Sequence, residues 1–528
     1  MIASDRTTAG ARPRERAAAV STWAGQHRGE IALALVVVAL GLGLRAWVGA
    51  GPTGTLNLDE ATVALQAEQI RSGQLSVFFP NQGYGGTLEP MLVALSFLVL
   101  GATPLAVQVV PVACGLATAV VCVRVAARLG LGPVGQAATG ILAWCWPAYA
   151  VAFSIEERGF YGVAPLIGMV QVLLVLRLSG DGRDRSVERR DLLALGLALG
   201  LGWWQTPLSV LVAVPAGAWL VARRPRVVLR SGWAAGAAVV GAAPWLAWNL
   251  AHDWASFDRA PGLGLTWWDR VVDFWERLST ATGLATPFDP DRALVGWSWA
   301  GAVLVVAVLA VATARTLDRA PGLLAVLVVG HSLLYGMNSL VDAVGPDIRY
   351  QSLVLPVLAV AGGAVVPEVT GRGARTALLG GLAAGAVALA VWGITGLGAY
   401  AESDDVSLLL GSQDLERVAA LLDEREVGTA VTDVAGAQIT FLTDGRVRAS
   451  SFAVPRFPDL ERAARRDRTS TYVLDDRQLG NHDRLRAHLE ARGVGYEEVV
   501  IGLWHVVFVD GRVLPEEVPI ATFGDLGG

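Results

Sequence analysis

The sequence predicts an α-helical polytopic membrane protein with about eleven transmembrane helices and a small α/β domain at its C-terminal end. Of the 528 residues, 53% are hydrophobic and 17% are charged, whereas a soluble domain carries roughly 25% charged residues. The mean hydropathy is +0.48. Long apolar runs recur up to about residue 400, and beyond that point the charge rises and the runs shorten.

Each predicted span is an apolar stretch of about 20 residues, the length that crosses a bilayer as a helix. These stretches lie at 31–50, 106–127, 135–155, 162–180, 191–208, 209–222, 232–250, 294–314, 321–341, 350–367 and 377–398. Residues 90–102 are also apolar, but the run is too short. We therefore interpret it as a re-entrant or interfacial segment.

The arginines set the orientation, because cytoplasmic loops of membrane proteins carry the positive charge. If the N-terminus is inside, Arg-rich segments such as 183–190 and 223–230 fall on the cytoplasmic side. Counting 90–102 as a span would put them outside. We therefore predict a plasma-membrane protein whose residues 1–28 form a disordered cytoplasmic tail. The transmembrane domain then covers 29–400, with external loops at 51–105, 156–161, 251–293 and 342–349.

The last part of the chain, 401–528, is predicted to be an extracytoplasmic α/β domain. "GTAVTDV" and "STYVLDD" have the composition of strands, and "YEEVVIGLWHVVFVD" is rich in strand-forming residues. "NHDRLRAHLEARG" has the period of an amphipathic helix.

Composition also excludes some functions. The net charge of −5 gives no indication of nucleic-acid binding. The cysteines Cys114, Cys122 and Cys145 all lie in apolar runs, and neither a CxxC nor a His-rich spacing occurs. The sequence therefore predicts neither a disulfide framework nor a zinc site.

Two adjacent acids, Asp59 and Glu60, follow the first span in "LNLDEATVA". Acids suit the first turn of a helix, and "NLDE" resembles a capping box in which Asn57 is the cap. Alternatively, a carboxylate at the membrane surface can take a proton from an incoming nucleophile. Both interpretations stay open on residue type alone.

The second external loop, "SIEERGFYG", packs Glu156, Glu157, Arg158 and Tyr161 between two spans. One interpretation is a site for a headgroup or sugar, in which Arg158 holds a phosphate through its planar guanidinium. The other is ordinary interfacial anchoring, with solvated charges and the tyrosine in the aromatic belt.

Two further segments contribute candidates at external span ends. In "GPDIRYQSLVLP", Arg349 lies at the external end of a predicted span, where the positive-inside rule disfavours a basic residue. It is therefore either a partner for a lipid phosphate or a structural residue that snorkels to the membrane surface. Tyr350 follows it directly. In "WLAWNLAHDW", His252 lies among tryptophans that suit either an aromatic belt or a sugar site.

Taken together, these segments resemble the GT-C class of polytopic glycosyltransferases, which take a sugar from a polyprenyl-phosphate donor. The protein O-mannosyltransferases and lipid A aminoarabinose transferases are the most similar members. The resemblance covers about 31–400 and rests on "LNLDEA", "LEPMLVALSFLVLGA", "EERGFYG" and "RYQSLVLP". In this class, a first-loop Asp acts as base on the acceptor and basic residues of external loops hold the donor phosphate.

Carried over to this chain, the resemblance implies that Asp59 is the base, with Glu60 as its neighbour. It implies that Arg158 and Arg349 bind the donor phosphate, and that Tyr161 and Tyr350 line the site. Two features depart from the class pattern. Glu89 precedes Pro90 where the class has a basic residue or His, and the acids Glu156 and Glu157 suit a metal or a cationic sugar.

The function expected from the sequence is therefore sugar transfer from a polyprenyl phosphate to an extracytoplasmic glycan, lipid or protein acceptor, with inversion. A phosphate already held by arginines needs no metal, so we expect no cofactor, although a divalent metal stays open. The alternatives are a transporter or lipid flippase and an inactive scaffold. Transporters place ionisable groups at mid-membrane, whereas the acids here gather at one surface.

Overall fold

The computed structural model describes residues 28–180, 184–258, 264–339, 347–401, 413–466, 470–475 and 480–520. Apart from its last residue, the predicted tail 1–28 lies outside the described residues. So do residues 342–346 of the last predicted external loop.

The chain is helical up to Ala401. The first helices are α2 (Arg28–Gly49), α3 (Leu58–Arg71), α4 (Leu88–Leu100), α5 (Pro104–Arg128), α6 (Pro133–Cys145), α7 (Ala148–Phe153), α8 (Ala164–Ser179), α9 (Arg185–Gln205) and α10 (Val210–Arg223). They are followed by α11 (Gly232–Gly241), α12 (Ala243–Ala251), α13 (Trp267–Glu276), α14 (Leu278–Ala281), α15 (Ala300–Thr316), α16 (Leu323–Tyr335), α17 (Leu355–Val365) and α18 (Arg372–Ala401). Short 3-10 helices join several of them, including η7 (Arg349–Val354) before α17.

Three of the described helices, α2, α5 and α18, are long and apolar enough to cross a membrane. The pair α11 and α12 also qualifies but is bent by 64°. The other predicted spans coincide with shorter helices or with helices of more mixed composition, so the count of about eleven stays a prediction.

Prolines explain why two predicted spans are not single helices. The stretch 135–155 is divided into α6 and α7 at Pro147, and 232–250 is divided just before Pro244. Proline has no backbone N–H and its ring clashes with the preceding turn, so each helix restarts there.

The outer surface of the helical part is apolar. Leu35 on α2, Leu98 and Val99 on α4 and Val303 on α15 are all more than half exposed. Contiguous apolar surface of this kind is rare on soluble monomers and suits contact with lipid.

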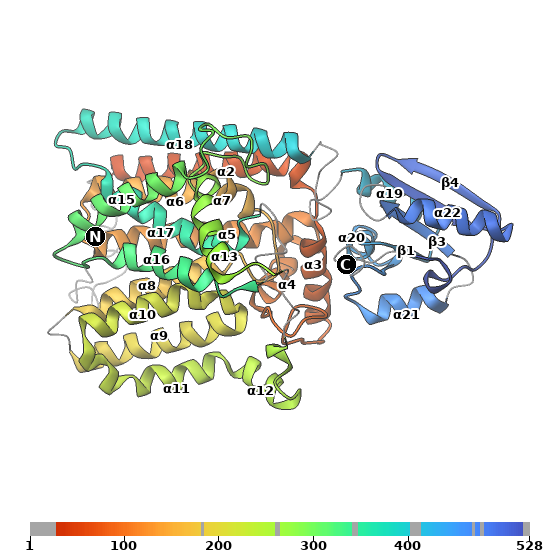
Figure 1. Cartoon of the computed structure of the whole chain (residues 1–528), viewed down its shortest axis with the longest axis horizontal. Coiled ribbons are helices and arrows are strands. Elements are labelled where there is room, and N and C mark those ends of the chain that lie inside the picture. The colour runs from red at the N-terminus through yellow and green to blue at the C-terminus, as the bar shows by residue number, and fades with distance from the viewer. Residues whose placement is uncertain are drawn as a thin grey trace, which may run out of the picture.

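One helix lies differently from the others. Figure 1 shows α3 running across the ends of the long helices, at the end of the bundle where the α/β domain lies. The short apolar helix α4 packs against both α3 and α5.

The C-terminal domain contains a mixed five-stranded sheet of order β2-β1-β3-β5-β4. Its strands are β1 (Thr429–Thr432), β2 (Arg448–Ser451), β3 (Ser470–Asp475), β4 (Tyr496–Ile501) and β5 (Trp504–Val509). Its helices are α19 (Gln413–Glu424), α20 (Gly436–Leu442), α21 (Pro458–Arg466) and α22 (Asn481–Arg492). Strand β1 pairs in parallel with β2 and β3, whereas β5 is antiparallel to both β3 and β4.

Apolar side chains cover both faces of the sheet. Leu415 and Val418 of α19 pack on one face, and Leu485 and Leu489 of α22 pack on the other. The predicted strands and the helix at 481–493 are therefore confirmed. Strand β2 was not predicted, because its four residues, "RASS", carry no apolar alternation.

The two parts of the chain share a packed interface. Helix α20 packs on α3, and Phe441 of α20 stacks on Phe97 of α4 with ring centroids 6.1 Å apart. The side-chain amide of Asn81 donates a 2.7 Å hydrogen bond to the carbonyl of Pro455. The loop that follows β2 is thereby held against the first external loop.

Candidate active site

The N-terminus of α3 gives the two adjacent acids different roles. Glu60 is fully buried and completes a capping box, in which its Oε2 accepts from the Asn57 N–H at 2.9 Å and its own N–H donates to Asn57 Oδ1 at 2.9 Å. Of the two interpretations of these acids, helix capping therefore applies to Glu60. The same helix geometry turns Asp59 away from the capping box.

Asp59 contacts the C-terminal domain. Its side chain is 18% exposed, and its Oδ1 accepts from Nη2 of Arg456 at 3.4 Å. The guanidinium of Arg456 also lies 4.7 Å above the ring of Phe79, a favourable cation–π arrangement. Asp59 therefore lies where the first external loop meets the loop after β2.

Glycines let the first and second external loops interlock. Gly85 and Gly159 both have positive φ, and a Cβ on either would lie within 3 Å of an aromatic ring. The ring facing Gly85 belongs to Phe160, and the ring facing Gly159 belongs to Phe79. The two rings meet edge to face with centroids 5.9 Å apart. Only glycine fits both the backbone conformation and the space.

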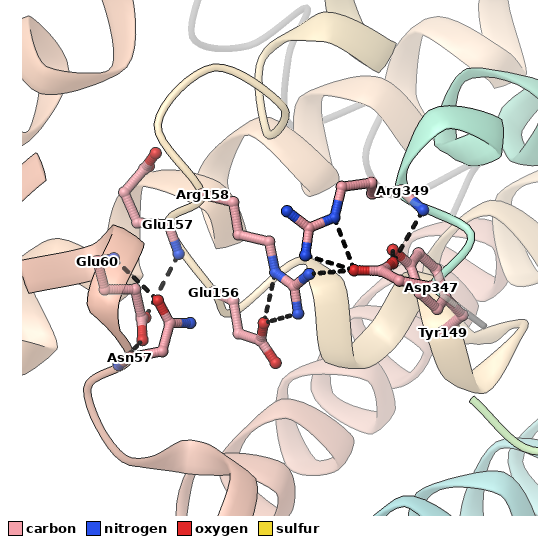
Figure 2. Close-up of polar contacts among 8 residues, drawn as sticks. All are labelled: Asn57, Glu60, Tyr149, Glu156, Glu157, Arg158, Asp347 and Arg349. Atoms are coloured by element: carbon pink, nitrogen blue, oxygen red, sulfur yellow. Dashed lines mark hydrogen bonds and ion pairs between the residues drawn. The ribbon is translucent and has the colours of Figure 1, made fainter. Parts of the chain in front are cut away.

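Arg158 is the centre of a buried ion-pair network (Figure 2). Its Nε donates to Glu156 Oε2 at 2.6 Å, its Nη2 contacts the same oxygen, and its Nη1 donates to Asp347 Oδ2 at 3.0 Å. All three guanidinium nitrogens are thus engaged. The side chain of Arg158 is 4% exposed.

Arg349 contacts the same carboxylate oxygen as Arg158. Its Nε and Nη2 lie 2.7 and 2.6 Å from Asp347 Oδ2, and its backbone N–H donates to Oδ1 at 2.9 Å. Tyr149 of α7 donates to the same Oδ1 at 2.6 Å. Among the residues that Figure 2 draws, Nη1 of Arg349 makes no polar contact. Asp347 therefore fixes both arginines, and among the eight residues drawn Nη1 of Arg349 is left without a bond.

The charges within this network balance. Burial alone would raise the pKa of Asp347, but the guanidinium groups of Arg349 and Arg158 lower it to about 2. Burial likewise raises the pKa of Glu156, with Arg158 opposing the rise. Two cations thus face two carboxylates in a dry site, where such pairs hold together only with good geometry.

Burial raises the pKa of two neighbouring acids. Burial raises the pKa of Glu60 to about 8, and the nearby Glu156 adds to the rise. Burial followed by the charge of Glu89 raises the pKa of Glu157 well above its ordinary value. The backbone N–H of Glu157 points to Glu60 Oε1 at 3.4 Å, so the second loop is fastened to the head of α3.

Glu89 accepts hydrogen bonds from the backbone just before α8 and from a neighbouring glutamine. Its Oε1 accepts from the Val163 N–H at 2.8 Å and from Gln205 Nε2 at 3.2 Å, and its Oε2 accepts from the Gly162 N–H at 3.3 Å. These N–H groups precede α8. A carboxylate at a helix N-terminus satisfies unpaired donors and complements the helix dipole.

Tyrosines fill the space beside the arginines. Tyr161 and Tyr350 are buried and pack edge to face with centroids 6.1 Å apart, and Arg349 lies 5.9 Å from the Tyr161 ring centroid. Tyr84, from the first external loop, interacts electrostatically with Asp59, Arg349 and Arg456 at once, and burial raises its pKa. Asp59 and Arg349 also interact electrostatically.

His252 lies apart from these contacts. It follows α12, is exposed, and stacks on Trp248 with ring centroids 4.2 Å apart. Its Nδ1 is 2.8 Å from the Trp248 carbonyl. The structure therefore brings together the predicted residues at 59–60, 156–161 and 349–350 and leaves His252 on the aromatic surface of α12.

Sequence reasoning missed four residues of this site. Asp347 stands two positions before Arg349, and that spacing is the only local signal it offers. Tyr149 lies inside an apolar run, and Tyr84 lies in a glycine-rich turn. Arg456 gives no signal, because its partner Asp59 is 397 positions away.

At the level of sequence, no family model and no curated protein matches the chain. Solved structures do match it. ArnT from Cupriavidus metallidurans in the apo state has a TM-score of 0.67 at 11% identity, over 91% of this chain and 98% of that one. The same protein bound to undecaprenyl phosphate has a TM-score of 0.63 at 12% identity, over 92% and 98%. The apo oligosaccharyltransferase of Archaeoglobus fulgidus has a TM-score of 0.50 at 12% identity, over 86% and 70%.

The chain therefore has the fold of the GT-C polytopic glycosyltransferases, as the sequence resemblance predicted. Among these structures the likeness to ArnT, an aminoarabinose transferase, extends over nearly the whole length of both chains and includes the C-terminal region.

Proposed function

We propose that this protein is a plasma-membrane glycosyltransferase that transfers a sugar from a polyprenyl-phosphate donor to an extracytoplasmic acceptor. The main support is that Asp59, the partly exposed acid of α3, lies within electrostatic reach of Arg349 and Arg456. A base and cations for a departing phosphate are thus gathered at one end of the helical bundle. The fold is one in which an ArnT structure holds undecaprenyl phosphate.

In the proposed reaction, the Asp59 carboxylate removes the proton of an acceptor hydroxyl. The hydroxyl oxygen forms a bond to the sugar C1 as the bond between C1 and the phosphate oxygen breaks. A single displacement of this kind inverts the anomeric centre. General-base assistance of this type contributes about 10²–10⁴-fold to a rate.

The leaving polyprenyl phosphate gains one negative charge, and the arginines stabilise it. Arg349 is the better placed for direct contact, because its Nη1 is left over after its bonds to Asp347. Arg158 acts through Asp347, since its own three nitrogens are engaged. Tyr161 and Tyr350 line the site beside Arg349.

No metal is required by this scheme, because fixed cations already meet the phosphate. The two acids suggested as metal ligands have other environments, since Glu156 holds Arg158 and Oε1 of Glu157 accepts from the Gly159 N–H at 3.1 Å.

The C-terminal domain lies at the same end of the bundle as α3 (Figure 1). If Asp59 faces the outside, as the arginine distribution predicts, this domain is extracytoplasmic too. The acceptor, whether glycan, lipid or protein, then approaches Asp59 beside the loop that carries Arg456.

Incubating purified protein with a panel of polyprenyl-phosphate sugars tests the proposal, and release of polyprenyl phosphate is the readout. We expect release with at least one donor and its loss in Asp59→Asn. A transporter or flippase would move lipid without releasing phosphate, and a scaffold would be indifferent to the substitution. No release from any donor by the wild-type protein would overturn the proposal.

A further inference from the structure

The C-terminal domain contains a cluster of metal-ligand type that lies apart from Asp59. His482, Glu498 and His505 each offer one ligand atom, and these atoms all lie within 4.8 Å of one another. The Glu498 oxygen is 2.7 Å from the His482 nitrogen and 2.5 Å from the His505 nitrogen. The two imidazole rings stack with centroids 3.6 Å apart.

Three separate segments supply these donors. His482 is on α22, Glu498 on β4 and His505 on β5. His505 pairs with Val500 across the antiparallel ladder, and Glu498 is two positions from Val500. Side chains two positions apart on a strand point to the same face, so Glu498 and His505 share the face that α22 covers.

The cluster is unusual for this composition. The whole chain has six histidines, and two of them stack on one another around a single carboxylate oxygen. His482 and His505 are 23 positions apart, and Glu498 lies seven positions before His505. This spacing matches no common zinc-binding motif, so the sequence alone does not reveal the cluster.

We propose that His482, Glu498 and His505 bind a divalent transition metal, for which Zn²⁺ is the best match. Two imidazole nitrogens and one carboxylate oxygen form a donor set that zinc accepts, and water completes a tetrahedron. Donor atoms around tetrahedral zinc lie about 3.4 Å apart, given bonds of about 2.1 Å. Each imidazole nitrogen must therefore move away from the Glu498 oxygen by roughly 0.7–0.9 Å for the ion to enter.

The surroundings allow this opening. Glu498 is 21% exposed and His505 is 13% exposed, which leaves a path from solvent. Arg486 Nη2 lies 3.1 Å from His482 Nε2 and 3.9 Å from Glu498 Oε2, and because the side chain is 42% exposed, the guanidinium can swing outward to admit the ion. Asp483 lies 3.7 Å from Nδ1 of His482. A carboxylate facing the second ring nitrogen is the usual support of a metal-bound histidine.

The bound ion would join α22 to the hairpin of β4 and β5. Its role is structural, because none of the three donors is among the described residues assigned to the sugar-transfer site. The inference is therefore independent of the proposed transferase activity.

The test uses the full-length protein in detergent, stripped with a chelator and titrated with Zn²⁺ by calorimetry. We expect one site per chain and a higher Tm on zinc addition. His482→Ala, Glu498→Gln and His505→Ala should each weaken binding by more than about 100-fold, since loss of outer-shell partners alone costs 10–100-fold. His488→Ala on the same helix is the matched control and should bind like wild type.

Cobalt substitution supplies a second readout. Co²⁺ in the site should give visible absorption bands typical of a four-coordinate ion, and these should be absent from His505→Ala. If zinc binds His482→Ala and wild type equally, or if no zinc binds stripped wild type, the proposal is overturned. Circular dichroism of each variant separates loss of the site from loss of the fold.

Discussion

Asp59 in the first external loop contacts Arg456 of the C-terminal domain at 3.4 Å, across 397 positions of the chain. Both side chains are less than one-fifth exposed. The partly exposed acid of the candidate site is thus held by a residue that is not part of the helical bundle. The C-terminal domain is therefore a component of the site.

Asp59→Asn should abolish the proposed base without changing the fold. We expect kcat for sugar transfer to fall by about 10²–10⁴-fold, with the KM for the donor little changed. Polyprenyl-phosphate release measured against donor concentration checks this. Glu68→Gln, a neutralised acid further along α3, is the control and should retain activity. A residual rate near that of the control would exclude Asp59 as the base.

Arg456→Ala should loosen the contact between the two parts of the chain. The pair is mostly buried but long, at 3.4 Å, so its loss should cost roughly 1 kcal/mol, about fivefold in an equilibrium, and we expect a decrease in transfer of about that size. Hydrogen exchange should increase in 452–457, where Pro455 also accepts from Asn81. Arg465→Ala removes an exposed arginine of α21 that pairs with Glu516. An equal effect of that variant would mean that Arg456 has no particular role.

Arg349→Ala should act on donor binding. A hydrogen bond from a charged group contributes about 1.5–3 kcal/mol, so the donor KM should rise by about 10–100-fold. Arg349→Lys keeps the positive charge but loses the planar guanidinium whose Nε and Nη2 both contact Asp347. It should therefore restore only part of the affinity for the donor. Titration with a polyprenyl phosphate measures this directly, and an unchanged affinity in Arg349→Ala would refute the assignment.

Arg158→Ala should act mainly on stability. It leaves the buried carboxylates of Glu156 and Asp347 short of a partner, and breaking a buried ion pair costs about 3–5 kcal/mol. Thermal unfolding in detergent should show a lower Tm than for Arg349→Ala. The opposite pattern, an unchanged Tm with a raised donor KM, would place Arg158 in direct contact with the phosphate.

Glu60 should make stability depend on pH. Burial raises its pKa from an ordinary value of 4.5 to about 8, so the folded protein keeps a proton that the unfolded chain releases. The stability from this proton is fully present below about pH 4.5 and is lost as pH rises through about 8. Its size is at most on the order of 5 kcal/mol.

Glu60→Gln is neutral at every pH and keeps an oxygen for the capping box. Its Tm should therefore fall less than that of the wild type between pH 5 and 8.5. If the Tm of the two proteins changes with pH in the same way over this range, Glu60 is already ionised in the folded protein and the prediction is wrong.

Much of the helical architecture follows from the sequence because it depends on local composition. Apolar runs predicted helices at each proposed span, and the capping box at Asn57 formed as its residues indicate. The breaks at Pro147 and before Pro244 were present in the sequence as proline but were not predicted. The polar edge strand β2 was missed, because strand pairing rather than its own composition places it.

The site was predictable only in part for a related physical reason. The acids of "NLDE" and the charges of "EER" are local signals at span ends. Their partners are not local, because Asp347 joins Arg158 and Arg349 only after the helices pack. Which of the two adjacent acids lies outside the capping box was also unpredictable, since the capping geometry of Glu60 decides it.

The Glu89 side chain ties a lipid-facing helix to the loop that carries Arg158. Leu95, Leu98 and Val99 of α4 are mostly exposed, while Glu89 at the start of α4 holds the N–H groups just before α8. Any displacement of α4 by the surrounding bilayer is therefore transmitted to the segment next to the ion-pair network. The rate of the proposed sugar transfer should therefore differ between thick and thin membranes, with the lipid acting on this fold as a mechanical environment as well as a solvent.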